Sequence, residues 1–182
     1  MTIVPDSKDW TWVLQRPCPE CGLDTSAFPK EAVGGMVVAN AISWQDVLTG
    51  PDNVRNRVVP DRWSALEYGC HVRDVLRLYN YRLELMLVKD DPAFPDWDQD
   101  ATAVADRYSG QQPLTVAAGL GQAAEAIAAR FATVTGEQWQ RTGTRGDGAA
   151  FTVETFARYF IHDPIHHLYD VAGIRASGWG QA

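Results

Sequence analysis

The chain has 182 residues and a mass of 20.1 kDa, enough for one domain with a sizeable hydrophobic core. Hydrophobic residues make up 46% and charged residues 21%, which argues against a disordered or fibrous chain. The net charge is −7, and no basic stripe is present that would bind nucleic acid. There is no signal-peptide pattern, no apolar run of the roughly 20 residues that span a membrane, and an odd number of cysteines. These features together predict a cytoplasmic protein.

Hydrophobic residues that recur at intervals of three and four predict four helices. The predicted helices span about residues 30–48, 64–88, 113–135 and 152–173. The second helix has the clearest start, because Ser64 followed by Glu67 matches a capping box. Pro113 suits the first turn of the third helix, and Thr152 is a suitable cap for the fourth.

The segments between these helices are long and carry poor strand signals, because no alternating run of useful length is present. Loops of about a dozen residues or more are longer than the roughly 2–8 residues that usually connect bundle helices. They cover residues 49–61, 90–112 and 136–150. The predicted fold is all-α, a four-helix bundle with long connecting loops. Residues 1–182 form one such domain, with an N-terminal extension at about 1–27.

Three of the four histidines lie within six residues of each other, and they suggest a metal site. His162 and His166 are four residues apart, so on a helix their rings lie one turn apart on one face and could bind the same ion. A third ligand is needed, and His71 is the remaining histidine, at the edge of the apolar face of the second helix. His167 cannot face the same way as His166, and we expect it at the surface or beside a ligand.

Three imidazoles would leave a fourth coordination position open, which is typical of catalytic sites, and they suit zinc first, with nickel or ferrous iron as alternatives. Asp163 and Asp170 are placed to hold the second ring proton of a ligand. Glu67 lies one turn before His71, where it could be a cap, a partner of the ligand or an additional ligand. Glu67 and Asp163 are the candidate catalytic carboxylates. A polar stripe without metal would also explain the spaced histidines.

Two stretches of the chain carry a resemblance to a known family: WSALEYGCHV at residues 63–72 and YFIHDPIHH at 159–167. Together they resemble the DinB/YfiT-like metalloprotein family, and the resemblance extends from about the first predicted helix to Val171. It implies a four-helix bundle with a divalent metal held by three histidines, here His71, His162 and His166. The better understood members of this family are thiol-dependent transferases and isomerases that use bacillithiol, mycothiol or glutathione.

The resemblance implies an enzyme, a thiol S-transferase or related isomerase in which the metal lowers the pKa of a small thiol and presents the thiolate to an electrophile. The expected partners are a low-molecular-weight thiol, an electrophilic substrate and a second copy of the chain in a homodimer, with no nucleic acid or membrane. Two alternatives stay open. The metal could serve a non-catalytic bundle in a structural, sensing or storage role, or the bundle could act through dimerisation alone.

The sequence Cys18-Pro19-Glu20-Cys21-Gly22 lies before the first predicted helix and is not part of the family pattern. It resembles half of a zinc ribbon, but the chain has no second cysteine pair, and the βαβ setting of a thioredoxin-like redox motif is absent. Three uses are open: a structural or incidental one, an oxidation-sensitive pair, or a second metal site. Cys70 precedes His71 and points about 100° away from it on a helix, so we do not expect it to be a ligand.

Overall fold

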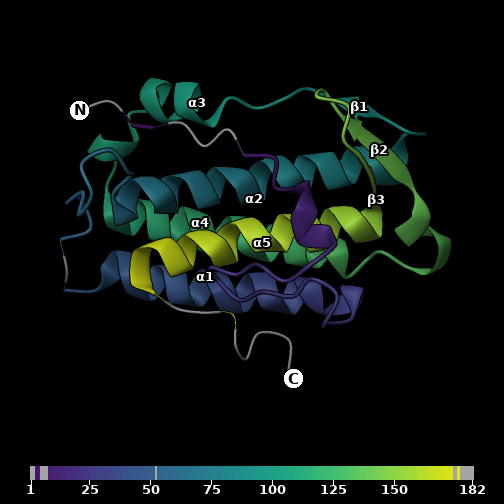
Figure 1. The fold of residues 1–182 in the computed structure, drawn as a ribbon, viewed down its shortest axis with the longest axis horizontal. Helices are drawn as coiled ribbons and strands as arrows, with labels where there is room; N and C mark the ends of the chain where they lie inside the picture. Colours follow the sequence, from purple (N-terminus) through teal and green to yellow (C-terminus); the bar gives the residue numbers. More distant parts are fainter. Residues whose placement is uncertain (1–2, 5–7, 52, 174–175, 177–182) are drawn as a thin grey trace.

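Four long helices form a bundle in the computed structural model, which describes residues 3–4, 8–51, 53–173 and 176 (Figure 1). They are α1 (Val33–Thr49), α2 (Ala65–Val88), α4 (Pro113–Phe131) and α5 (Val153–Ala172). Helix α4 packs against both α1 and α2, and α5 packs against the same two helices. The predicted four-helix bundle is therefore confirmed. None of the helices in the described part of the chain is long and apolar enough to cross a membrane.

The ends of the long helices follow local sequence signals. The Ser64 hydroxyl accepts a hydrogen bond from the Glu67 backbone N–H, and the Glu67 carboxylate accepts one from the Ser64 backbone N–H at 2.8 Å, which confirms the predicted capping box. Thr152 caps α5 by accepting a hydrogen bond from the Thr155 backbone at 3.1 Å. Helix α5 ends at Gly173, whose φ of 67° is the left-handed conformation that glycine adopts without steric penalty.

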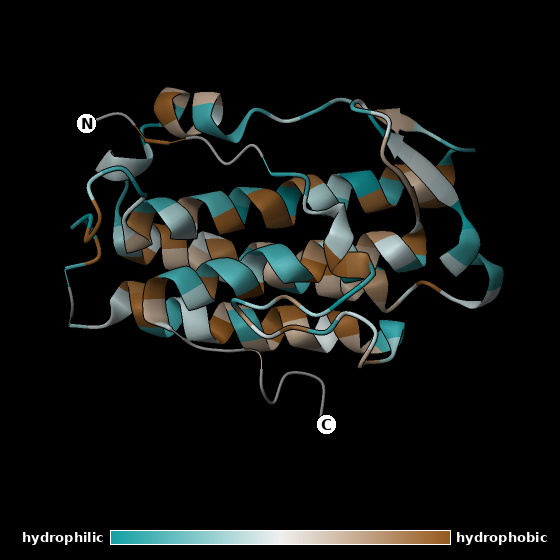
Figure 2. Cartoon of the chain, viewed as in Figure 1, coloured by the Kyte–Doolittle hydropathy of each residue, from teal (hydrophilic) through white to brown (hydrophobic). Residues whose placement is uncertain are grey.

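The core lies between the four helices, where their hydrophobic stretches meet (Figure 2). Fully buried side chains come from every long helix, and each contributes about 1.5–3 kcal/mol of burial free energy. They include Trp44, Leu66, Leu83, Leu120 and Phe160. Trp44 and Asn40 of α1 also donate side-chain hydrogen bonds to the carbonyl oxygen of Pro164, at 3.1 and 3.2 Å. These two bonds fix α5 against α1 at the turn that carries the histidines.

The segment predicted as a loop at 90–112 contains a short helix, so this part of the sequence interpretation was wrong. Helix α3 (Gln99–Ala105) is capped by Asp98, whose carboxylate accepts a hydrogen bond from the Ala101 backbone N–H at 2.8 Å. The third predicted helix also ends earlier than expected, at Phe131, because Thr135 turns into extended backbone and caps a short 3-10 helix, Gly136–Gln140.

A small three-stranded sheet at one end of the bundle was not predicted either. Strand β1 (Ala93–Phe94) pairs in parallel with β2 (Thr142–Arg145), and β2 pairs antiparallel with β3 (Ala150–Thr152), with Gly143 opposite Phe151. Strands of two to four residues are too short to show an alternating pattern in sequence. Gly143 is needed at this position, since a Cβ there would lie 2.8 Å from Cγ of Met86.

The N-terminal segment from Thr11 onward lies against the bundle and contacts α5 (Figure 1). Its 3-10 helix, Thr11–Leu14, contacts α5. The Thr25 hydroxyl donates a hydrogen bond to the Val13 carbonyl at 2.7 Å, and Arg158 of α5 donates to the carbonyls of Thr25 and Phe28. The segment therefore covers one side of the helix that carries three of the four histidines.

Candidate metal-binding site

Helix α5 carries two interleaved pairs of metal-binding side chains. His162 and His166 form one pair, and Asp163 and His167 form the other, each four residues apart and so on one face of the helix. The pairs are offset by one residue, which turns the second pair about 100° away from the first. One helix therefore presents donor atoms in two different directions, although all four residues line the same cleft.

The first group of donors, here called the open cluster, consists of His71 from α2 with Asp163 and His167 from α5. One donor atom from each residue lies within 4.8 Å of the others. The Oδ2 atom of Asp163 is 3.5 Å from Nε2 of His71 and 3.7 Å from Nε2 of His167. All three residues line a cleft of about 420 Å³, so a ligand could reach them from solvent.

His71 is the most unusual member of the open cluster. Its side chain is only 1% exposed, and neither ring nitrogen has a hydrogen-bond partner among the described residues. A buried polar group without a partner costs about 1–3 kcal/mol, so these nitrogens are expected to have another use. Burial lowers the pKa of His71, although the charge of Asp163 opposes this effect, and the neutral ring that results is the form that binds metal.

Asp163 gives the open cluster a negative charge. Burial alone would raise the pKa of its carboxyl, but the adjacent His71 and His167 outweigh burial and lower it to about 2. The carboxylate is therefore ionised at neutral pH. Two imidazoles and one carboxylate are a donor set that suits a divalent ion such as zinc or ferrous iron, and the cleft leaves coordination positions free for a substrate.

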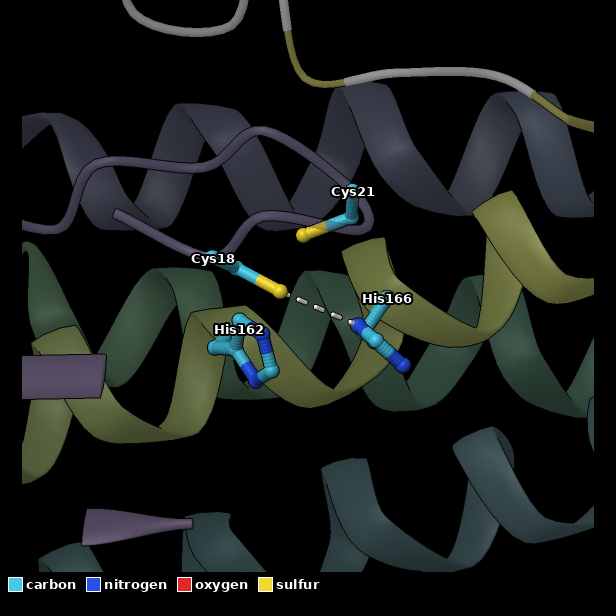
Figure 3. Close-up of side chains that lie close together, drawn as sticks. All are labelled: Cys18, Cys21, His162 and His166. Atoms are coloured by element: carbon cyan, nitrogen blue, oxygen red, sulfur yellow. Dashed lines mark hydrogen bonds between the residues drawn. The ribbon is translucent and has the colours of Figure 1, made fainter. Parts of the chain in front are cut away.

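The second group, here called the closed cluster, consists of Cys18 and Cys21 from the N-terminal segment with His162 and His166 from α5 (Figure 3). One donor atom from each residue lies within 4.8 Å of the others, and Cys18 Sγ is 3.6 Å from His166 Nδ1. All four residues are buried. Burial lowers the pKa of His162 to about 3, helped by His166, and raises the pKa of the Cys21 thiol to about 12.

Asp170 lies between the two clusters. Its Oδ2 atom is 3.1 Å from Nδ1 of His167 in the open cluster, and its Oδ1 atom is 3.8 Å from Nε2 of His166 in the closed cluster. Burial would raise the pKa of this carboxyl, but the hydrogen bond and charge of His167 lower it below its usual range. An ionised Asp170 can therefore accept the Nδ1 proton of His167, whereas its distance of 3.8 Å from His166 is too long for a hydrogen bond.

The three predicted ligands are distributed over both clusters. His162 and His166 lie together, as their spacing predicts, whereas His71 lies with His167 and Asp163. Among the described residues, none of these compact donor groups combines His71 with His162 or His166. The three-histidine set stays a prediction, and the geometry favours a different grouping. Sequence reasoning did not propose His167 as a ligand, although its four-residue spacing from Asp163 is the signal for this alternative grouping.

The two predicted catalytic carboxylates occupy very different places. Asp163 lines the cleft, whereas Glu67 does not. The Glu67 carboxylate accepts hydrogen bonds from Nε of Arg57 at 2.9 Å and from the Ser64 backbone N–H at 2.8 Å. Burial would raise the pKa of Glu67, but these hydrogen bonds lower it overall. Its contacts therefore assign Glu67 to the start of α2, and a catalytic role for it stays a prediction that the geometry does not favour.

The rest of the cleft combines charges of both signs with aromatic surface, because aspartates such as Asp96 and Asp147 line it as well as arginines. Arg82 and Arg145 line it, and Nη1 of Arg145 donates a hydrogen bond to the Tyr159 hydroxyl at 3.0 Å. The Nε atom of Arg82 is buried and has no hydrogen-bond partner among the described residues. Trp97 also lines the cleft and stacks on His71 at 5.4 Å between ring centroids. The cleft can therefore hold a small molecule that carries both an apolar part and polar or charged groups.

The fold and its donor clusters define a metal-binding four-helix bundle. The model of the DinB superfamily matches residues 15–171, and the chain belongs to this superfamily. Among solved structures, the chain is similar to YfiT from Bacillus subtilis, with a TM-score of 0.72 and 18% identity over 82% of this chain and 88% of that one. YfiT is described as a probable metal-dependent hydrolase with an unusual four-helix bundle topology, and at this identity the likeness supports the fold alone. No curated protein matches the chain.

Proposed function

We propose that the protein is a divalent-metal-dependent enzyme that works at the open cluster, with a low-molecular-weight thiol as its cosubstrate. The observation that carries the proposal is the buried ring of His71, whose Nδ1 atom has no hydrogen-bond partner among the described residues and whose Nε2 atom faces Asp163 at 3.5 Å on the wall of a cleft. A donor set without an opening would suit a structural ion equally well. The cleft is the reason to prefer an enzyme over a storage or purely structural bundle.

His71, Asp163 and His167 are the residues that would hold the ion, with zinc as the first choice and nickel or iron as alternatives. When bound, such an ion supplies Lewis acidity, which lowers the pKa of a thiol or water and polarises an electrophile. Asp170 orients the site, because it can accept the Nδ1 proton of His167 and so direct Nε2 of the same ring toward Asp163.

The cleft residues indicate the class of substrate. The Nε atom of Arg82, which has no hydrogen-bond partner among the described residues, is a donor that favours an anionic group, whereas the Arg145 guanidinium already pairs with Asp147. Trp97 provides apolar surface for the rest of the molecule. We therefore propose S-transfer to, or thiol-assisted isomerisation of, an electrophile with an anionic group.

Hydrolysis is a second candidate, and a specific observation favours it. Two histidines with one carboxylate resemble the ligand set of hydrolytic zinc enzymes more than a three-histidine site does. In that reaction water takes the place of the thiol. The description of YfiT as a probable metal-dependent hydrolase is compatible with this second candidate.

Both candidates can be tested with full-length protein that has no polyhistidine tag and is loaded with zinc, nickel or ferrous iron in turn. One set of reactions contains a small thiol with an epoxide or a conjugated acid, and a second set contains activated esters and amides. We expect a metal-dependent rate in the first set, reduced on the order of 100-fold or more by His71→Ala and by Asp163→Asn. Asp106→Asn, an exposed aspartate outside the cleft, is the matched control.

The outcomes separate the candidates clearly. A metal-dependent rate only with esters or amides would favour the hydrolase. Metal bound by His71, Asp163 and His167 without any rate above background in either set would contradict an enzymatic role and favour the non-catalytic bundle.

A further inference from the structure

The closed cluster takes no part in the proposed reaction, yet it gathers the four side chains best suited to bind zinc. We propose that Cys18, Cys21, His162 and His166 form a second, structural zinc site, which fastens the N-terminal segment to α5. The proposal does not depend on the function proposed above, because it uses none of the residues of the open cluster.

The donor set and its spacing fit zinc. Two thiolates and two imidazoles are one of the standard tetrahedral ligand sets of structural zinc. With Zn–S near 2.3 Å and Zn–N near 2.0–2.1 Å, a tetrahedral angle places sulfur and nitrogen about 3.5–3.6 Å apart. Cys18 Sγ lies 3.6 Å from His166 Nδ1. A thiol hydrogen bond could have the same length, so the convergence of all four donors within 4.8 Å is what distinguishes a metal site.

Burial makes this site closed. The four residues are between 0% and 5% exposed, and only the two histidines also line the cleft. The Nε2 atom of His162 is buried without a hydrogen-bond partner among the described residues. Zinc in structural sites has all four positions filled by protein, whereas catalytic zinc keeps one open. The closed cluster offers four protein donors, enough to fill all four positions, whereas the open cluster offers three.

The backbone of the cysteine loop is shaped for this purpose. Gly22 has a φ of 80°, and its N–H donates a hydrogen bond to the Cys18 carbonyl at 2.9 Å. The Cys18 N–H in turn donates to the Leu23 carbonyl at 2.9 Å. The resulting turn brings Cys18 and Cys21 toward the α5 histidines (Figure 3). A glycine directly after the second cysteine is therefore required by the turn itself.

The orientation of His166 adds a further argument. Its Nδ1 atom faces Cys18, while its Nε2 atom lies 3.7 Å from Glu20 Oε2 and 3.8 Å from Asp170 Oδ1. Histidines that bind metal through one nitrogen commonly direct the other toward a carboxylate, directly or through water. Glu20 lies between the two cysteines in sequence, so the same short loop supplies both thiols and a carboxylate that orients the opposing ring.

The site would also shape the cleft. Trp10 packs against the rings of His162 and His166, with centroids 5.3 and 4.8 Å apart, and Trp10 lines the cleft as well. Zinc in the closed cluster would hold the cysteine loop and the rings beneath Trp10 in fixed positions. One wall of the proposed active site would therefore depend on it.

Zinc analysis of reduced, full-length protein without a polyhistidine tag tests the site. We expect Cys18→Ala/Cys21→Ala to bind one zinc per chain less than the natural protein, while Cys70→Ala, the third buried cysteine, binds the same amount. The same difference of one zinc per chain is expected when His71→Ala is present in both proteins. Loss of the open cluster, and with it of the proposed function, can therefore be told apart from loss of the closed cluster. Equal zinc content in the natural protein and the double variant would overturn the proposal.

Cobalt substitution gives a second readout. Cobalt in the closed cluster should show sulfur-to-metal charge-transfer absorption and tetrahedral d–d bands, retained in Asp163→Asn and lost in Cys18→Ala/Cys21→Ala. If the double variant does not fold, a mercurial titration of the natural protein replaces it. Release of one zinc for two modified thiols supports the site. No release of zinc, or a Cys18–Cys21 disulfide in protein purified with zinc present, would overturn it.

Discussion

The open and closed clusters use the same two turns of α5 but differ in what covers them. The closed cluster is sealed by a cysteine loop whose two thiols are at most 1% exposed, whereas the side chain of Asp163 in the open cluster is 34% exposed. The α5 residues of both clusters line the same cleft, but only His162 and His166 also meet the two cysteines. The comparison shows that the segment packed over α5, more than the helix itself, determines which further donors its histidines meet.

Zinc-dependent stability should separate the clusters most strongly. At free zinc about a thousand-fold above its Kd, a site present only in the folded state adds about 4 kcal/mol. In a chain of this size that corresponds to a rise of about 8–16 °C in Tm. We expect most of this rise to disappear in Cys18→Ala/Cys21→Ala and to remain in Asp163→Asn, as measured by thermal unfolding at fixed zinc. If both variants lose the same part of the zinc-dependent rise in Tm, the two clusters do not differ in how zinc stabilises the fold.

The pH dependence of the metal-free protein tests the burial of the closed cluster. Burial lowers the pKa of His162 to about 3, below the ordinary value near 6.5, so the folded state resists protonation. Its contribution to stability is fully present above about pH 6.5 and is lost as the pH falls toward 3. Between pH 7 and pH 5 we expect a loss of about 2 kcal/mol from this residue.

Urea unfolding of chelator-treated protein at pH 7 and pH 5 measures that loss, with His162→Gln as the comparison. The variant should lose about 2 kcal/mol less than the natural protein over this interval. The same loss in both proteins would mean that His162 is accessible to protons in the folded state, and the closed cluster would then not be closed.

The smallest effect is expected at Glu67, which is one turn from His71 but belongs to neither cluster. Glu67→Gln weakens the capping box and the ion pair with Arg57, and it should lower the free energy of unfolding by about 1 kcal/mol. Zinc content should not change. Loss of zinc at unchanged stability would instead make Glu67 part of the open cluster, as one interpretation of the sequence allowed.

The four long helices were predictable because their signals are local. Ser64 and Glu67 are three residues apart and define the start of α2 without help from the rest of the chain. The sheet depends instead on pairing between residues such as Ala93 and Thr144, which are far apart in sequence and form strands too short to show a pattern. Local signals therefore identified the four helices of the bundle but not the small sheet at one end of it.

The candidate site shows the same difference between local signals and contacts made by residues far apart in sequence. The spacing of His162 and His166 was sufficient to predict that their rings lie together, because both are on one helix. Nothing local brings Cys18 to His166, since 148 positions separate them in the chain. From the sequence, a second metal site was only one of three possible uses of the cysteine pair. The packing of the N-terminal segment brings this pair to the two histidines that complete the donor set.

Asp170 has a consequence for how the two clusters could evolve. Its two carboxylate oxygens face a histidine of each cluster, His166 on one side and His167 on the other. A cation in either cluster would draw on the same negative charge, so occupancy of one site weakens the electrostatic support for the other. A change at position 170 would therefore affect both sites at once. Selection on one site would then constrain the other through this single side chain.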